Sequence, residues 1–213
     1  MQTDLITAYA TKNNITLSPN QLNQLTQLQQ EVLETNKTMN LTAITDPTDF
    51  AIKHIIDSLT LIPFISDSSD VIDVGTGAGF PGVVLKIAKP DIKITLLDST
   101  QKRIKFLQKM VDKLSLSSVQ CIHARAEEYA KKHSNFDICT ARAVARFDTL
   151  AGYTLPLVKQ GGLVLAMKGP DVSVEINDAK PIIKKLGGKV RQISVVEISP
   201  DIRHSIILVD KIK

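Results

Sequence analysis

A glycine-rich segment limits most strongly what this chain can fold into. At positions 73–82 the sequence reads Asp-Val-Gly-Thr-Gly-Ala-Gly-Phe-Pro-Gly, and its glycines directly follow the short, mainly apolar run Val71–Val74. Glycine permits positive φ and lets a ligand approach the backbone closely, so such a run suits the turn from a strand into a helix. In open α/β sheets that turn borders the crevice where ligands bind. The segment therefore predicts a ligand-binding turn.

Short apolar runs alternate with longer stretches of helical character from residue 70 onward. The predicted parallel strands are Val71–Val74, Ile92–Leu97, Val119–His123, Asp137–Thr140 and Gly161–Met167, and the predicted antiparallel pair is Lys189–Ile198 with Ser205–Val209. Apolar strands separated by helices indicate a parallel sheet that is covered on both faces. The fold class predicted is doubly wound, Rossmann-like α/β.

The first third of the chain has helical periodicity instead. Ser18 has the position of an N-cap, Pro19 that of the first helical residue and Gln21 that of the capping-box partner. A further helix is predicted from about residue 47 to 61. We expect one domain, 1–213, with an N-terminal helical region at 1–66 and a Rossmann-like core at 67–213.

Composition excludes several classes of protein. The 213 residues include only two cysteines, Cys121 and Cys139, in apolar runs and without a CxxC partner, so we expect buried thiols and no metal site. No signal peptide or long apolar span is visible, which predicts a cytoplasmic protein without a membrane anchor. A net charge of +4 permits nucleic-acid binding without requiring it, and few aromatic residues argue against base stacking as the main grip.

The glycine spacing fits two kinds of cofactor. Gly77, Gly79 and Gly82 match the GxGxxG pattern of dinucleotide sites, while Gly75, Gly77 and Gly79 match the GxGxG loop of S-adenosylmethionine enzymes. The adjacent Asp73 favours the second, because a carboxylate there would repel a pyrophosphate. A nicotinamide-dependent oxidoreductase remains the rival enzyme, and a ribosome-assembly binding module without turnover is a third possibility.

Acidic side chains follow the second and third predicted strands. Asp98 lies where both kinds of cofactor site place a carboxylate on the ribose hydroxyls. Ser99 or Thr100 could cap the next helix, which would leave Asp98 free for a ligand. At the end of the third strand, Glu127 and its neighbour Glu128 suit either adenine contacts or the first turn of a helix.

The fourth strand ends in a segment that carries transfer chemistry in such folds. It contains neither an Asn-Pro-Pro-Tyr or Asp-Pro-Pro-Tyr run nor a Pro-Cys pair, which argues against amino-group methylation and against Cys139 as a nucleophile. Arg142 follows as a cation that would face the cleft. Several basic residues are expected near this edge, and they predict either a phosphate-binding rim or a solvated helix face. They are Lys102, Arg103, Lys105, Lys109, Arg125, Arg142, Arg146 and Lys168.

Five segments together resemble one family over nearly the whole chain. They are Asn40–Ile44, His54–Leu59, Asp73–Gly82, Leu97–Arg103 and Arg142–Ala145. These segments are similar to the RsmG family, also called glucose-inhibited division protein B. The resemblance implies a methyltransferase that uses S-adenosylmethionine to methylate N7 of a guanine in 16S ribosomal RNA, within the 30S subunit. It places Gly75, Phe80, Ala126, Glu127 and Arg142 at the cofactor, beside Gly77 and Asp98, which the spacing indicates.

Guanine N7 carries an exposed lone pair, so this reaction needs neither a general base nor a covalent nucleophile. Positioning would supply most of the rate, up to roughly 7–11 kcal/mol. We expect Arg142 to be the catalytic residue, with Arg125 or Lys168 as further contacts to phosphate or guanine O6. His54 and Asp57, three residues apart on one helix, are predicted to form a local structural pair. We expect the protein to be a monomer.

Overall fold

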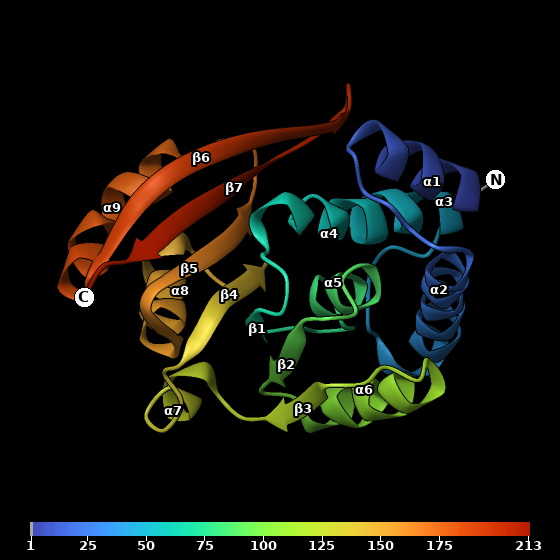
Figure 1. The fold of residues 1–213 in the computed structure, drawn as a ribbon, viewed down its shortest axis with the longest axis horizontal. Helices are drawn as coiled ribbons and strands as arrows, with labels where there is room; N and C mark the ends of the chain where they lie inside the picture. The colour runs from blue at the N-terminus through green and yellow to red at the C-terminus, as the bar shows by residue number, and fades with distance from the viewer. Residues whose placement is uncertain (1) are drawn as a thin grey trace.

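The computed structural model describes residues 2–213 and contains one seven-stranded sheet (Figure 1). The strands are β1 (Asp70–Val74), β2 (Lys93–Asp98), β3 (Val119–His123), β4 (Phe136–Arg142), β5 (Val158–Lys168), β6 (Gly188–Ser199) and β7 (Ile202–Lys211). Their order is β3-β2-β1-β4-β5-β7-β6. The first five strands pair in parallel, and β7 is antiparallel to both β5 and β6. The predicted doubly wound sheet with a closing antiparallel pair is confirmed.

Helices cover both faces of the sheet. The α-helices are α1 (Gln2–Lys12), α2 (Pro19–Met39), α3 (Pro47–Phe50), α4 (Asp57–Leu59), α5 (Gly82–Ala88), α6 (Gln101–Lys113), α7 (Ala126–Tyr129), α8 (Phe147–Thr154) and α9 (Ser173–Lys185). Successive strand residues belong to different cores: Val71 packs in the core of α5 and α6, and Ile72 in that of α7, α8 and α9. This alternation is what a strand buried on both sides requires.

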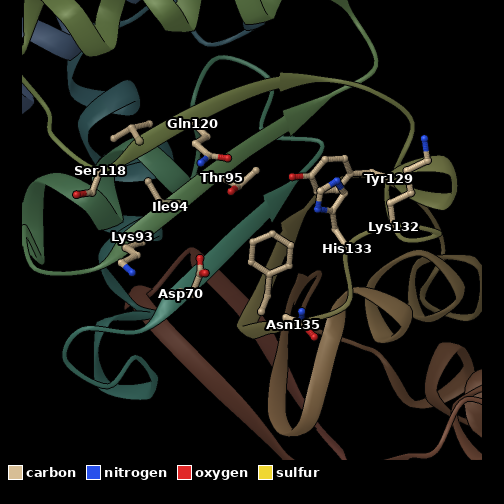
Figure 2. Close-up of a pocket in the computed structure, with 12 residues that line it drawn as sticks. Asp70, Lys93, Ile94, Thr95, Ser118, Gln120, Tyr129, Lys132, His133 and Asn135 are labelled. Atoms are coloured by element: carbon tan, nitrogen blue, oxygen red, sulfur yellow. The ribbon is translucent and has the colours of Figure 1, made fainter.

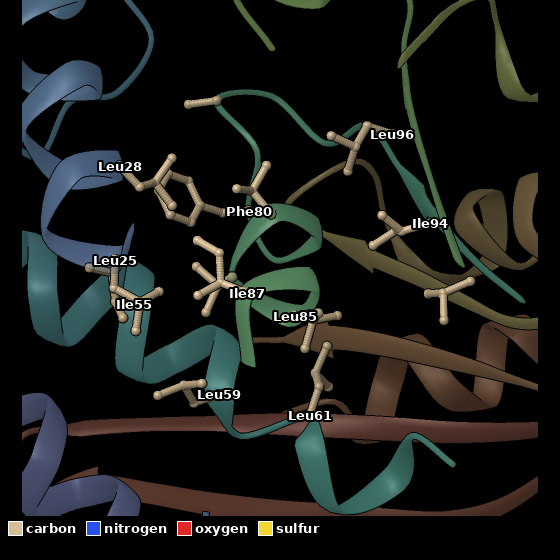
Figure 3. Close-up of a cluster of buried hydrophobic side chains, with 14 of the residues drawn as sticks. Leu25, Leu28, Ile55, Leu59, Leu61, Phe80, Leu85, Ile87, Ile94 and Leu96 are labelled. Atoms are coloured by element: carbon tan, nitrogen blue, oxygen red, sulfur yellow. The ribbon is translucent and has the colours of Figure 1, made fainter. Parts of the chain in front are cut away.

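The N-terminal helices join the first of these two cores. Leu25 and Leu28 of α2 are fully buried, together with Ile55 and Leu59 from the segment that leads to β1. Figure 3 shows them around Phe80 and the side chains of α5. The helical region and the sheet therefore share one hydrophobic core. Among residues 2–213, no helix has both the length and the apolar character that crossing a membrane requires.

The predicted capping box at the start of α2 is confirmed. The Ser18 side chain accepts a hydrogen bond from the Gln21 N–H at 3.3 Å, and the Gln21 side-chain oxygen accepts one from the Ser18 N–H at 2.7 Å. The Gln21 amide nitrogen also donates to the carbonyls of Ile87 and Ala88, at 2.7 and 3.1 Å. Gln21 thus closes the start of α2 and ties it to the end of α5.

The helix predicted from 47 to 61 forms, but it is not a regular α-helix. Six residues, Ala51–Ile56, are π-helix between α3 and α4. Sequence periodicity does not distinguish a π turn from an α turn, because both present an apolar stripe. Single π turns inside α-helices occur frequently at functional sites, and the residues of this one face the end of β4.

We predict that Gln21→Ala destabilises the protein more than Ser18→Ala. Loss of an N-cap side chain costs about 1 kcal/mol. Gln21→Ala removes the reciprocal cap and also leaves two carbonyls without their donor, which should raise the cost to about 2 kcal/mol. Urea unfolding of both variants measures the difference. Equal losses would mean that the contact between α2 and α5 contributes nothing to stability.

Candidate functional site

A pocket lies at the carboxyl ends of β1 and β2, beside the glycine turn. Its volume is about 180 Å³. It is lined by Val74, Gly75, Leu97, Asp98, Ser99, Ala124, Arg125, Ala126, Glu127, Val144 and Tyr153. Four of the residues predicted to bind a cofactor, Gly75, Asp98, Ala126 and Glu127, therefore lie together around one cavity. We refer to it as the carboxyl-edge pocket.

A larger cavity of about 620 Å³ lies at the other end of the same strands (Figure 2). Asp70 and Lys93, which begin β1 and β2, line it opposite the rings of Tyr129 and His133. Parallel α/β sheets bind ligands at the carboxyl ends of their strands. The smaller pocket is for this reason the candidate site.

The glycine turn has the backbone that the sequence predicts. Gly75, Gly77 and Gly79 have φ of 68°, 60° and 101°, a region that disfavours other residues. A Cβ at Gly75 would lie 2.6 Å from Cγ2 of Val144, a pocket residue. At Gly77 the nearest atom to such a Cβ is a backbone oxygen 3.9 Å away, so the turn is open there.

Asp98 holds this turn in place. Its carboxylate accepts hydrogen bonds from the Gly77 N–H at 3.0 Å and the Thr100 N–H at 2.8 Å, and Arg103 lies 3.4 Å away. The prediction that Ser99 or Thr100 would cap α6 is wrong, because Thr100 is the N-cap but its side chain makes no capping hydrogen bond. Asp98 instead satisfies an N–H group at that end itself. Its carboxylate is nearly buried at 3% exposed and lines the pocket.

Asp73 does not face the pocket as the sequence argument assumed. It is fully buried, and its carboxylate accepts hydrogen bonds from the Gly82 N–H at 2.9 Å and the Thr140 hydroxyl at 3.0 Å. Burial raises the pKa of Asp73 to about 6. The carboxylate thus accepts the hydrogen bond of the first N–H group of α5. N–H groups at a helix N-terminus are the donors that commonly bind phosphate. Asp73 disfavours a pyrophosphate by occupying that donor, not by charge repulsion in the cleft.

Arg142, at the end of β4, is not the isolated cation that the sequence suggested. Its guanidinium donates to the Lys53 carbonyl at 2.9 Å and to the Asp57 carboxylate at 2.9 Å. A third bond, of 2.8 Å, joins it to Nδ1 of His54. The side chain is 18% exposed, and the ring of Phe80 lies 5.5 Å from the guanidinium carbon. Three acceptors thus fix one arginine, two of them in the π-helical segment and the third on Asp57, which directly follows it.

The arginine also decides the tautomer of His54. A guanidinium can only donate, so Nδ1 of His54 accepts and the ring proton is on Nε2, which lies 2.8 Å from the Thr42 hydroxyl. Burial and the charge of Arg142 lower the pKa of His54 to about 4. The ring stacks on Phe80 with centroids 4.7 Å apart. Phe80 is 4% exposed and lies in this cluster, outside the lining of the carboxyl-edge pocket.

The predicted local pair of His54 and Asp57 is replaced by a shared contact with Arg142. Asp57 also lies 2.8 Å from Nδ1 of His204 on β7, which sequence reasoning missed. Despite opposing desolvation, hydrogen bonds and charge from His204 and Arg142 lower the pKa of Asp57. No local pattern could have indicated His204, because 147 residues separate it from Asp57 and only the sheet order brings them together.

The other predicted basic residues differ in their surroundings. Lys168 is bound to Glu175 at 2.7 Å, and Arg146 to Asp178 at 2.6 Å. Arg125 is 73% exposed at the rim of the carboxyl-edge pocket and lies 3.9 Å from Glu127. Of the cysteines, Cys139 is fully buried as predicted, whereas Cys121 is only partly buried.

The residues present fit an adenosyl cofactor better than a dinucleotide. The turn is open at Gly77, and a carboxylate lies at the end of β2, where a ribose would be held. The N–H groups of Gly75, Gly77 and Gly82 already have acceptors within the protein, so they do not form a phosphate cradle. Because most ligand pockets are about 300–1,000 Å³, a cavity of 180 Å³ would enclose only part of the cofactor.

The sheet has a Rossmann-like fold that solved structures of methyltransferases share. TrmN from Thermus thermophilus superposes with a TM-score of 0.57 at 16% identity, covering 74% of this chain and 48% of that one, so this chain spans about half its length. Precorrin-6y C5,15-methyltransferase from Geobacter metallireducens GS-15 gives a TM-score of 0.56 at 13% identity, covering 82% and 92%. These likenesses concern the fold.

Sequence comparison identifies the family. The family described as GidB, rRNA small subunit methyltransferase G, matches residues 21–206. Ribosomal RNA small subunit methyltransferase G of Clostridium botulinum (strain ATCC 19397 / Type A) is 41% identical over 206 residues, which covers 94% of this chain and 86% of that protein. The protein of the same name from Clostridium perfringens (strain SM101 / Type A) is 46% identical over 186 residues, 84% and 78% of the two chains. The chain belongs to this family, as its motifs predicted.

We predict that Gly75→Val weakens binding of S-adenosylhomocysteine at least tenfold, about 1.4 kcal/mol. The new side chain would displace Val144 and strain a backbone at positive φ. Gly161→Val is the matched control, because Gly161 also has a positive φ, of 81°. A Cβ added there would have no atom within 4 Å, and Gly161 lies at the opposite edge of the sheet. Calorimetry on folded proteins decides: normal binding by Gly75→Val would remove Gly75 from the site.

A second prediction concerns pH. The folded state holds His54 neutral with a pKa near 4, against 6.5 for an unperturbed histidine. As pH falls from about 6.5 toward 4, the unfolded chain takes up this proton first, so this contribution to stability is lost over that range. NMR should show the Nε2–H tautomer at neutral pH and a ring titration near 4. A midpoint near 6.5 would contradict the assigned hydrogen bond to Arg142.

Proposed function

We propose that this protein transfers a methyl group from S-adenosylmethionine to N7 of a guanine in 16S ribosomal RNA. The observation that carries the proposal is the identity of 41–46% with rRNA small subunit methyltransferase G proteins along most of the chain. The carboxyl-edge pocket supports it, because its residues suit an adenosyl group. The reaction also agrees with the surroundings of the end of β4, where the described side chains are poorly placed to act as a general base.

The groups near the end of β4 are poorly placed for proton abstraction or covalent attack. Cys139 is fully buried, and burial raises the pKa of its thiol well above the ordinary value. Both ring nitrogens of His54 already contact partners, and Asp73 is buried beneath the turn. Methylation of guanine N7 requires no such group, because the attacking lone pair is already free. The protein would act by holding N7 in line with the methyl group, which the sulfonium of S-adenosylmethionine supplies.

Arg142 is the side chain we assign to the reacting end of the site. A guanidinium has five N–H donors. Three of them bond Lys53, His54 and Asp57, which leaves two without a partner in the described part of the chain. Held in this way, Arg142 would offer the two remaining donors to guanine O6, a phosphate or the cofactor without losing much conformational entropy on binding.

The cofactor would lie along the turn and the strand ends. Asp98 would accept hydrogen bonds from the ribose, while Gly75 and Gly77 allow close approach. Ala126 and Glu127 at the start of α7 would face the adenine. Phe80 would act indirectly, through its contacts with His54 and Arg142.

The partner we propose is 16S rRNA, within the 30S subunit, recognised by a monomer in the cytoplasm. The alternative, a ribosome-assembly module without turnover, binds the same partner but transfers nothing. Incorporation of labelled methyl from S-adenosylmethionine into 16S rRNA separates the two. Mapping of the modified guanines in cells that lack the protein identifies the target, and methyl incorporation at any atom other than guanine N7 would refute the finer proposal.

We predict that Arg142→Ala lowers the single-turnover rate of methyl transfer by roughly 30- to 1,000-fold, equivalent to about 2–4 kcal/mol. It should also cost about 3 kcal/mol of stability, because it leaves the carboxylate of Asp57 in a largely buried place without its arginine. Arg142→Lys should rescue poorly, since an ammonium cannot reproduce the planar contacts.

Leu28→Ala is the control for stability. It removes a fully buried side chain of α2 that is not a partner of Arg142, and it should cost a comparable 2–5 kcal/mol. Assays at a temperature where every variant is folded compare their rates. If Arg142→Ala transfers methyl as fast as Leu28→Ala does, Arg142 is a structural residue only.

A further inference from the structure

Helix α6 carries three lysines on its solvent-exposed face. Lys102, Lys105 and Lys109 are spaced by three and four residues, which places them in one stripe along the helix. All three are exposed, while Ile104 and Leu107 on the opposite side are buried in the core. We refer to these three lysines as the α6 stripe.

The α6 stripe lacks counter-charges. None of its lysines forms an ion pair with the acidic residues described between positions 2 and 213. The two other cations of the same helix do: Arg103 lies 3.4 Å from Asp98, and Lys113 lies 2.5 Å from Glu31. The absence of partners is therefore specific to the stripe and not general to the helix.

This arrangement opposes two rules of helix stability. Like charges three and four residues apart repel each other, and cations in the first turn oppose the helix dipole. Lys102 and Arg103 lie in that turn, which contains no acidic residue. Conflicts of this kind between local sequence and structure are expected mainly at functional sites. A bound polyanion would remove both penalties.

The stripe also has a definite place relative to the carboxyl-edge pocket. Asp98 and Ser99 line that pocket, and α6 begins two residues later. Lys109 lies seven positions after Lys102, so the stripe runs about 10 Å from the pocket rim along the helix. Arg125 lies exposed on the same rim.

We propose that the α6 stripe binds the phosphate backbone of the RNA substrate next to the nucleotide that enters the site. The proposal rests on the proposed function and adds the surface that grips the RNA. Lysines are point charges, so they would contribute affinity and orientation without reading sequence. Each phosphate contact releases counterions, which makes its contribution measurable as a dependence on salt.

The test compares two triple variants of equal charge. In one, Lys102, Lys105 and Lys109 are changed to Gln. In the control, the exposed lysines of α9 are changed to Gln: Lys180, Lys184 and Lys185. Figure 1 shows α9 at the opposite end of the sheet from α6. Both variants are titrated with protein-free 16S rRNA at several salt concentrations, and methyl transfer gives KM and kcat.

The α6 variant should lose about tenfold or more in RNA affinity, and its plot of log K against log salt should flatten by about two to three units. KM for RNA should rise while kcat and S-adenosylhomocysteine binding stay unchanged, and the melting temperature should not fall. The α9 variant should behave as wild type. A retained salt slope in the α6 variant, or an equal loss in the α9 variant, overturns the proposal.

Two other outcomes are distinguishable. If the α6 variant binds protein-free RNA normally and weakens only toward intact 30S subunits, the stripe contacts an acidic protein surface and the proposal is wrong. If the wild-type protein neither binds nor methylates 16S rRNA, whether protein-free or within 30S subunits, the proposed function fails and the inference fails with it.

Discussion

The contact on which the site most depends joins Arg142 to Asp57. It connects the end of a central parallel strand to the helical region that precedes the sheet, and His204 extends it to the antiparallel strand β7. The charges of Arg142 and Asp57 are largely buried, so each requires the other: removing one partner of such a pair costs about 3–5 kcal/mol. The N-terminal helices are consequently not an accessory layer but part of the wall that fixes the arginine.

A second buried carboxylate plays the corresponding role beneath the glycine turn. Asp73 binds the start of α5 and the hydroxyl of Thr140, and so joins β1, α5 and β4. Asp98 holds the other side of the turn through Gly77. Two carboxylates therefore hold the turn in the absence of a ligand: Asp73 binds the N–H of Gly82, and Asp98 binds the N–H of Gly77. Such preorganisation lowers the entropy lost on binding.

The candidate site lies at the carboxyl edge of the sheet. At the carboxyl edge, the glycine turn, the pocket and Arg142 meet, because parallel strands bring their ends to one side. Only at this edge do the predicted cofactor residues converge, although Phe80 and Arg142 lie in a cluster of their own beside the pocket.

The sequence by itself determined the strands, the capping box of α2 and the glycine turn, because each depends on residues close together in the chain: alternation, local hydrogen bonds and positive φ. Its motifs also identified the family. Only the tertiary structure decided which way polar groups point. Asp73 faces a helix end instead of the cleft, and Arg142 binds Asp57, 85 residues earlier in the chain. Such partners follow from the order of strands in the sheet and from the requirement that buried charges be paired. Neither of these produces a pattern among residues that are close together in the sequence.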